Sequence, residues 1–247
     1  MRISVPSISY KIEIPNTWNK DTYQIFINSL LTLGDQKYLD FNKKITPTTY
    51  EMIGIRVPIL RRIAKEIKKT NIIDFLENTQ ANYFEEILIE GFVIGYITDY
   101  DIFFKYFEKF LFHVDNWAVC DLCVSSFKII KMNKETFISV IDDLVKSDKT
   151  YYIRVGIVSL LEHYLDDKEY LNYFFCTMDS IDSDDYYVDM AIAWFISYLF
   201  IYYRDDTISY LKKNHLNKFT QNKAISKIRD SFRVSKSDKE LVLEYRK

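Results

Sequence analysis

The sequence predicts an all-α protein of the α-α superhelix class, and two observations support this fold class. The four prolines all lie early in the chain, at Pro6, Pro15, Pro47 and Pro58. Because proline disrupts a helix interior, nothing after Pro58 prevents helix formation. Apolar blocks of helical length then recur along the chain, with starts about 32 to 35 residues apart. A repeat of this length is typical of stacked helical units.

The first helix is expected from Trp18 to Leu33, with Gly34 at its end. Before it, residues 1–17 form an N-terminal extension that we expect to be irregular or strand-like. Its apolar residues alternate in part with polar ones, at Ile3, Val5, Ile12 and Ile14.

A further helix is predicted from Pro58 through Lys69. Proline is favoured in the first turn of a helix, where its missing N–H costs nothing. The apolar residues that follow have helical spacing and form one stripe: Ile59, Leu60, Ile63, Ala64 and Ile67.

Four apolar blocks follow at the repeat distance. They are Glu86 to Ile97, Ala118 to Ile130, Ile153 to Leu165 and Val188 to Phe200. A second helix precedes most of them, for example Tyr100 to Phe110 and Glu135 to Lys146. Two helices in each period indicate a HEAT-like solenoid. We therefore expect residues 1–247 to form a single HEAT-like domain, curved, with a concave binding face.

Composition excludes some classes of protein. Hydrophobic residues make up 48% of the chain, so a large core is expected. No run of about 18 apolar residues is present, and the N-terminus lacks the pattern of a secretory signal. We expect a cytoplasmic protein, a monomer, with no membrane partner.

Charge places a further limit on the partner. The formal net charge is −2, from 33 basic and 35 acidic residues, so no overall basic field attracts nucleic acid. Any such binding must come from a local patch. Basic residues cluster at Arg56, Arg61, Arg62, Lys65, Lys68 and Lys69, and again at Lys223, Lys227, Arg229 and Arg233. These clusters fit either solvated helix faces or phosphate contacts.

The cysteines do not indicate a metal site. Cys120 and Cys123 form a C-x-x-C pattern, and Cys176 lies far along the chain. No second cysteine or histidine cluster lies near the pattern, so we expect neither a metal nor another cofactor.

Trp117 and Asp121 are the most informative pair. Their four-residue spacing on a helix places an indole and a carboxylate on one face. Asp115 or Asn116 is suited to be the N-cap of this helix. Near a helix N-terminus the dipole favours an ionised acid by about 0.3–1 kcal/mol. The alternative is a core or rim aromatic residue beside a solvated acid.

Equivalent positions in stacked repeats line up, which brings two more residues into consideration. Arg154 lies near the start of one apolar helix, and Trp194 lies within the next. Taken singly, they fit a surface cation and a core aromatic residue. Together with Trp117 and Asp121 they suggest an aromatic surface with one acid and one base.

The chain resembles the AlkD-like DNA alkylation repair family, HEAT-like repeat DNA glycosylases, from about Ile45 to its C-terminus. Four segments carry the resemblance: Gly54 to Pro58 leading into Leu60-Arg61-Arg62, Asn116 to Asp121, Tyr151 to Arg154, and Ala191 to Trp194. The segment Asn222 to Arg229 is similar to the closing helix of the family.

The resemblance implies a role for each matching residue. Asp121 matches the catalytic acid, Trp117 and Trp194 match aromatics that hold the damaged nucleotide, and Arg154 matches a DNA phosphate contact. Arg56 and Lys223 lie in matching segments and are further candidate DNA contacts. The implied partner is duplex DNA with alkylated purines.

Two functions follow from these observations. The first is a DNA glycosylase for N3- or N7-alkylated purines, monofunctional, in which Asp121 stabilises positive charge on the sugar. The alternative is a catalytically silent HEAT-repeat relative that binds distorted or branched DNA, or a protein. Asp182, Asp184, Asp185 and Asp189 lie just before Trp194. This acidic balance favours the alternative, because DNA affinity comes mainly from neutralised phosphates.

Overall fold

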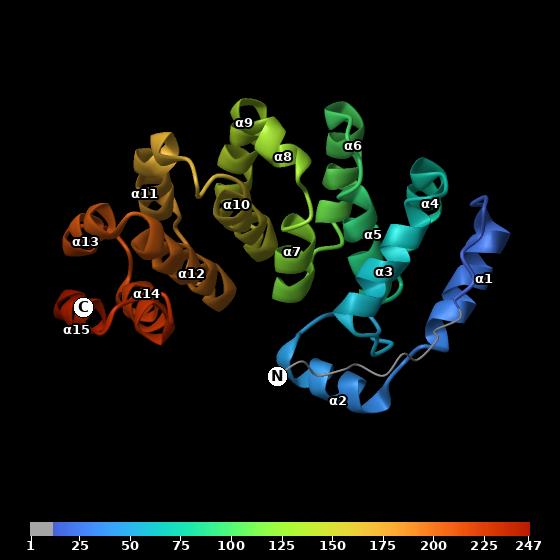
Figure 1. Cartoon of the computed structure of the whole chain (residues 1–247), viewed down its shortest axis with the longest axis horizontal. Helices are drawn as coiled ribbons and strands as arrows, with labels where there is room; N and C mark the ends of the chain where they lie inside the picture. Colours follow the sequence, from blue (N-terminus) through green and yellow to red (C-terminus); the bar gives the residue numbers. More distant parts are fainter. Residues whose placement is uncertain (1–11) are drawn as a thin grey trace. The chain divides into compact units, whose positions relative to one another are not determined.

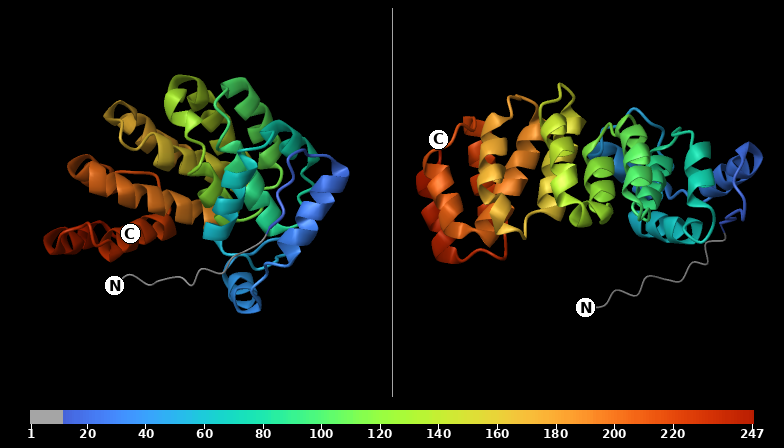
Figure 2. Two further views of the ribbon diagram at one scale, coloured as in Figure 1. Left: turned by 45° about the vertical axis from the view of Figure 1, so that its right-hand side comes forward. Right: turned by 90° about the horizontal axis from the view of Figure 1, so that it is seen from above.

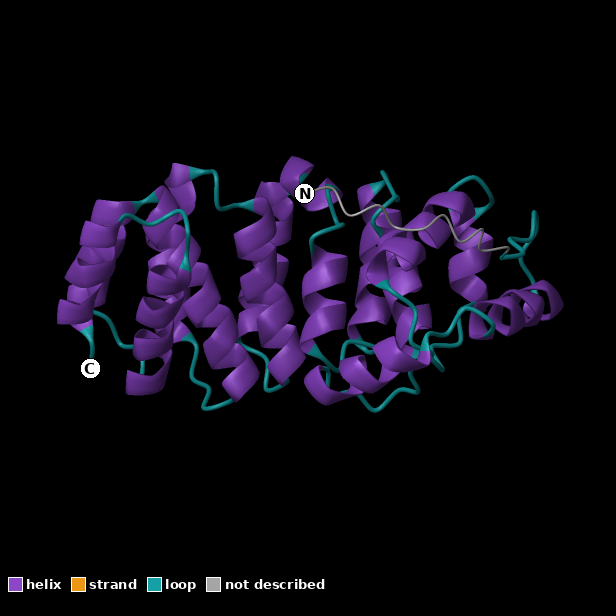
Figure 3. Cartoon of the chain, turned by 60° about the horizontal axis from the view of Figure 1, so that its bottom comes forward, coloured by secondary structure: helices purple, strands orange, loops and turns teal. Residues whose placement is uncertain are grey.

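The computed structural model describes residues 12–247, and this part of the chain consists of helices joined by loops, with no strand (Figure 3). Its one β contact outside helices is an isolated bridge between Glu51 and Tyr83. The fold class predicted from the sequence is therefore confirmed. Ile3 and Val5, on which half of the strand-like alternation rests, lie outside the described residues. Within residues 12–247 the chain divides into two compact units, with the boundary between His113 and Val114.

The first unit contains six helices. They are α1 (Lys20–Leu31), α2 (Gln36–Ile45), α3 (Val57–Ile67), α4 (Ile72–Asn78), α5 (Phe84–Ile94) and α6 (Tyr100–Leu111). Helix α5 is buried along its whole length and packs against α3, α4 and α6. Its Glu85 carboxylate accepts hydrogen bonds from the N–H groups of Ile53, Gly54 and Ile55 at 2.7–3.1 Å. Gly54 has a φ of 92°, which favours glycine, so this loop is fixed onto α5.

The start of α1 differs from the prediction by two residues. Asn19 is the N-cap, and its side chain accepts hydrogen bonds from the N–H groups of Asp21 and Thr22. Trp18 precedes the helix and is buried, where its indole N–H donates to Thr70 at 2.7 Å. Such a capping residue ends the extended segment because its side chain replaces the missing backbone partner.

The helix predicted from Pro58 to Lys69 is α3. Pro58 lies in its first turn as expected, and the helix ends at Ile67 with Lys68 as C-cap. The apolar stripe is confirmed, since Leu60, Ile63 and Ile67 are all buried. Helices α2 and α4 were not predicted.

The second unit holds the other helices. They are α7 (Trp117–Val124), α8 (Ile129–Met132), α9 (Lys134–Val145), α10 (Thr150–His163), α11 (Leu171–Ser180), α12 (Tyr186–Tyr202), α13 (Arg204–Lys212), α14 (Lys218–Asp230) and α15 (Lys236–Leu241). Two short 3-10 helices, Lys168–Tyr170 and Val242–Tyr245, complete it. Helices α7, α10, α12 and α14 pack side by side in this order, while α9 and α13 pack against α10 and α12 (Figures 1 and 2).

Three of the four predicted apolar blocks coincide with single helices, α5, α10 and α12. The block from Ala118 to Ile130 does not, because α7 ends at Val124 and a turn separates it from α8. The hydroxyl groups of Ser125 and Ser126 both donate to the carbonyl oxygen of Leu122, at 2.9 and 3.2 Å. Serine side chains compete in this way with the backbone hydrogen bonds that would continue a helix. The helices predicted at Tyr100 to Phe110 and Glu135 to Lys146 are α6 and α9.

Within residues 12–247, every helix is too short or too polar to cross a lipid bilayer.

Candidate functional site

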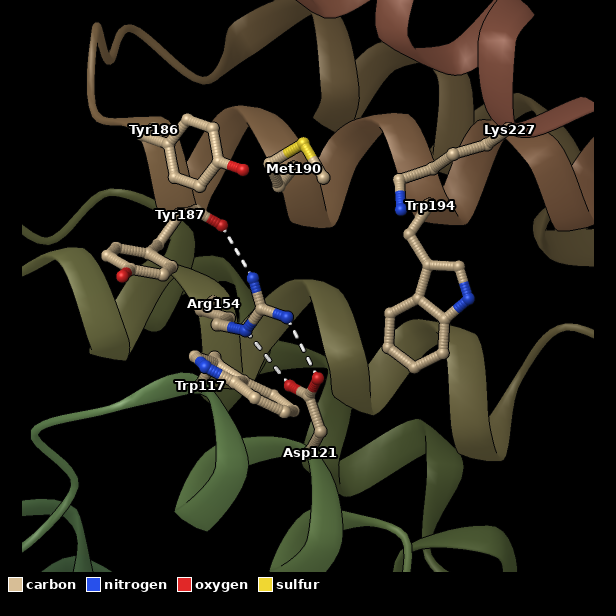
Figure 4. Close-up of a pocket in the computed structure, with 8 residues that line it drawn as sticks. All are labelled: Trp117, Asp121, Arg154, Tyr186, Tyr187, Met190, Trp194 and Lys227. Atoms are coloured by element: carbon tan, nitrogen blue, oxygen red, sulfur yellow. Dashed lines mark hydrogen bonds and ion pairs between the residues drawn. The ribbon is translucent and has the colours of Figure 1, made fainter. Parts of the chain in front are cut away.

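A pocket of about 270 Å³ opens in the second unit, between side chains of α7, α10, α12 and α14. Its lining residues are Trp117, Asp121, Arg154, Tyr186, Tyr187, Met190, Trp194 and Lys227 (Figure 4). Four of the five candidate residues in this half of the chain, Trp117, Asp121, Arg154 and Trp194, thus line one cavity. The role of each stays a prediction.

The start of α7 sets the direction of Trp117 and Asp121. Asn116 is the N-cap, and its side-chain oxygen Oδ1 accepts hydrogen bonds from the N–H groups of Ala118 and Val119, both at 3.0 Å. Asp115 in turn accepts from the Asn116 amide at 2.7 Å, which orients that amide. Trp117 is therefore the first helical residue, and Asp121 lies one turn later on the same face. Of the two N-cap residues considered from sequence, Asn116 has this role.

Arg154 binds the carboxylate of Asp121 with two hydrogen bonds. Its Nε atom lies 2.9 Å from Oδ1 and its Nη2 atom 2.8 Å from Oδ2 (Figure 4). The Nη1 atom donates to the carbonyl oxygen of Tyr187 at 2.7 Å. Burial opposes the charge of Arg154, but the hydrogen bonds and the charge of Asp121 outweigh it and raise the pKa of the arginine. The carboxylate is consequently fixed at the pocket, where 16% of its side chain is exposed.

The two tryptophans are neither fully buried nor fully exposed. Trp117 lies beside Asp121 and Arg154, and Trp194 lies on the other side of the carboxylate (Figure 4). A fully buried indole could not stack on a nucleotide without rearrangement. Both indoles line the pocket, so each has surface available to a ligand.

Lys227 supplies a second cation to the pocket. It comes from α14, and its side chain extends toward Trp194 in the close-up (Figure 4). Burial, followed by the nearby charges of Arg154 and Lys223, lowers the pKa of this lysine. The charged side chains that line the pocket are therefore two cations, Arg154 and Lys227, and one carboxylate, Asp121.

Two of the acids that precede Trp194 in the sequence, Asp185 and Asp189, lie outside the pocket lining and form hydrogen bonds within the protein. Asp185 caps α12, where it accepts hydrogen bonds from the N–H groups of Tyr187 and Val188. Asp189 is buried and accepts a hydrogen bond from the hydroxyl of Thr220 at 2.5 Å. Neither carboxylate lines the cavity, so the acidic run does not set the charge of its wall.

The remaining candidate DNA contacts lie outside the pocket lining. Lys223 is half-buried, one turn before Lys227 on α14, and its ammonium lies 5.5 Å from the ring centre of Phe219. Arg56 belongs to the first unit, where it is exposed and pairs with Asp35 at 3.4 Å. Their roles in DNA binding stay predictions.

Sequence reasoning missed half of the pocket lining. Tyr186 and Met190 lie eight and four residues before Trp194, so they share its helix face. That spacing was visible in the sequence, but the residue types carried no chemistry that would have drawn attention. Lys227 was noted only as part of a basic cluster.

The cysteines near Asp121 belong to the core. Cys120 and Cys123 are buried, and burial raises the pKa of Cys120. No group of three or more histidine, cysteine or acidic residues suited to hold a metal occurs within residues 12–247.

The comparison with known families covers the part of the chain that forms the pocket. The sequence model described as DNA alkylation repair enzyme matches residues 26–228, most of the chain. Among curated proteins, none matches the chain. The match includes every helix that lines the pocket, from α7 to the pocket-lining part of α14. The chain therefore belongs to the DNA alkylation repair enzyme family.

Proposed function

We propose that the protein is a DNA glycosylase that hydrolyses the N-glycosidic bond of N3- or N7-alkylated purines in duplex DNA. The observation that supports this most directly is the carboxylate of Asp121, fixed by Arg154 in a pocket between Trp117 and Trp194. Membership of a DNA alkylation repair family supports a role in repair and the binding of DNA.

The leaving group decides which chemistry the protein must supply. Alkylation at N3 or N7 gives the purine a positive charge, so the base leaves as a neutral molecule and needs no acid to protonate it. As the bond breaks, positive charge develops on the sugar. A carboxylate near C1′ stabilises this oxocarbenium-like state and orients the attacking water, as carboxylates do in glycoside hydrolysis.

Asp121 has free acceptor capacity for this role. Each of its oxygens accepts one hydrogen bond from Arg154, and each carboxylate oxygen has two acceptor sites. The thiol of Cys120 also forms a hydrogen bond with this carboxylate, so at least one acceptor site is left for the sugar cation or for water. The faces of Trp117 and Trp194 add attraction for a cation, worth about 0.5–2 kcal/mol for each contact.

The cations of the pocket suit the DNA backbone. Three N–H groups of Arg154 are used within the protein, and its guanidinium has five, so two remain for a phosphate. Lys227 reaches the same cavity, and Lys223 lies one turn before it on α14. Arg56 is a further candidate contact. Local cations of this kind compensate for the net charge of −2.

The chemistry requires neither a metal nor an organic cofactor, since a cationic base is already a good leaving group. We propose that one copy of the chain acts alone, as a single HEAT-like domain in the cytoplasm.

Release of free base tests the proposal. Duplex DNA carrying N7-methylguanine or N3-methyladenine is incubated at low salt with the wild type and with Asp121→Asn. We expect release by the wild type and a loss of at least about a hundredfold in the variant, the size seen when one electrostatic contact to a transition state is removed. Asp143→Asn is the matched control, since Asp143 is an exposed carboxylate of α9 outside the pocket lining. Equal release of free base by the wild type and by Asp121→Asn would contradict the proposal.

A second candidate is a catalytically silent relative that binds distorted or branched DNA, or a protein. The observation that favours it is the acidic balance of the whole chain. Binding of branched DNA without release of base from either alkylated duplex would support this candidate over the enzyme.

A further inference from the structure

A row of aromatic side chains leads along α12 away from the pocket. Trp194, Tyr198 and Tyr202 are four residues apart, so they share one face of the helix. The rings of Trp194 and Tyr198 meet edge to face, with their centres 6.0 Å apart. Tyr202 is 47% exposed at the far end. The wall of the pocket therefore continues onto the surface as a row of rings.

Arg233 lies over this row. Its guanidinium carbon is 5.8 Å from the ring centre of Tyr198 and 5.3 Å from that of Tyr202, within the range of cation–π attraction. The side chain is exposed, and no carboxylate of residues 12–247 pairs with it. Arg204, in contrast, is held by Asp238 at 2.6 Å. Because two rings orient Arg233 and no acid within the described residues neutralises it, its charge is available to an anion.

The loop that carries Arg233 is held at both ends. The hydroxyl of Ser231 accepts a hydrogen bond from the Arg233 N–H at 3.2 Å. Val234 is buried, and Ser235 caps α15 by accepting from the Asp238 N–H at 3.1 Å. The backbone therefore presents Arg233 from a fixed position between α14 and α15.

Two acids, Asp166 and Glu162, line a hollow beside Tyr198 and Tyr202. Asp166 pairs with Lys131 and Lys134 at 3.5 and 3.7 Å. Burial raises the pKa of Glu162 in the same hollow. The negative charge of these two carboxylates is thus partly neutralised, so it opposes an anion at Arg233 only weakly.

We propose that Arg233, oriented by Tyr198 and Tyr202, binds a backbone phosphate of duplex DNA beyond the nucleotide held in the pocket. The placement of the DNA rests on the proposed function. Tyr198 and Tyr202 lie four and eight residues after Trp194 on the same helix. Along the helix axis they are therefore about 6 and 12 Å from Trp194. Base pairs are stacked about 3.4 Å apart, so the phosphate lies about two to three nucleotides from the damaged one.

The test is the salt dependence of binding to an undamaged duplex. A contact with one phosphate contributes about 0.9 to the slope of log Kobs against log salt concentration. We expect Arg233→Gln to reduce the slope by about this amount and Arg233→Lys to preserve it. Replacing both tyrosines by leucine should weaken binding several-fold, whereas replacing both by phenylalanine should retain it, because phenylalanine keeps the rings.

Lys146→Gln is the matched control. Lys146 is an exposed cation at the end of α9, and the slope of this variant should equal that of the wild type. Thermal melting of each variant confirms that it is folded. An unchanged slope in Arg233→Gln overturns the inference, and so does a wild type that does not bind the duplex.

Base release by the wild type, measured separately, distinguishes this inference from the proposed function. A reduced slope in Arg233→Gln without base release by the wild type upholds the phosphate contact and rejects the glycosylase. Base release by the wild type with an unchanged slope in Arg233→Gln upholds the glycosylase and rejects the phosphate contact.

Discussion

Arg154 and Asp121 form a two-point ion pair, with N···O distances of 2.9 and 2.8 Å, at the floor of the candidate site. The same guanidinium reaches the carbonyl oxygen of Tyr187 at 2.7 Å. One buried side chain on α10 therefore joins α7 to α12. The position of the candidate catalytic acid and the packing of three helices depend on the same contacts.

Replacing Arg154 by glutamine should destabilise the protein as well as slow base release. Asp121 and the Tyr187 carbonyl would lose their partner, and breaking a buried ion pair costs about 3–5 kcal/mol. Because Asp121 keeps 16% exposure, we expect a loss of about 2–4 kcal/mol in the free energy of unfolding, measured by urea denaturation. The double variant with Asp121→Asn should lose less stability than the two single variants added together. Strict additivity would contradict a direct coupling.

The three tryptophans should respond differently to substitution. Trp117→Leu and Trp194→Leu remove rings that line the pocket, so we expect base release to fall at least about tenfold with small changes in stability. Steady-state rates and melting temperatures measure the two effects.

Trp18→Leu provides the contrast. This tryptophan is buried in the first unit and donates a hydrogen bond to Thr70, so its loss should lower stability by about 2–4 kcal/mol. Its effect on turnover by the folded fraction should be small. If Trp117→Leu destabilised the protein as strongly as Trp18→Leu, the pocket indole would be a core residue instead.

Acid should weaken the second unit through His163. This histidine is fully buried in α10 and donates from Nε2 to the carbonyl oxygen of Val124, at the end of α7, at 2.8 Å. Burial is the main cause that lowers its pKa from about 6.5 to about 4. Between these values the unfolded chain binds a proton and the folded chain does not. Stability should therefore fall as the pH drops from about 6.5 to about 4.

His163→Gln provides the control for this pH dependence, since glutamine is able to donate to Val124 but does not titrate. Urea denaturation of both proteins at several pH values measures the effect. The variant should lose less stability than the wild type in the same window, and parallel curves would show that other groups cause the loss.

The sequence predicted those parts of the site that depend on a single helix. Trp117 and Asp121 share a face because they are four residues apart, and Asn116 was one of two candidate caps for that helix. The pairing of Arg154 with Asp121 depends on the rotation of α10 against α7, which no local pattern encodes. The same is true of Lys227, whose place beside Trp194 depends on how α14 packs against α12.

The missed helices have a similar explanation. Helix α2 consists mostly of polar residues and buries only Asn42, so it has few of the apolar residues that identify a packed helix. Helix α4 has only seven residues, too few for a clear period. The apolar block after Trp117 was read as one helix because hydrophobicity continues through the turn at Ser125 and Ser126.

Lys227 should make DNA binding sensitive to alkaline pH. Burial first, and then the charges of Arg154 and Lys223, lower its pKa below that of an ordinary lysine, so it loses its proton earlier as the pH rises. A phosphate near this ammonium would then lose its partner, and affinity for an undamaged duplex should decline at a lower pH than the value of about 10.4 at which an ordinary lysine titrates. Lys227→Met should bind more weakly at pH 7 and vary less as the pH rises. Lys213→Met, at an exposed lysine after α13, should keep the wild-type profile. A wild-type profile in Lys227→Met would show that this lysine faces no phosphate.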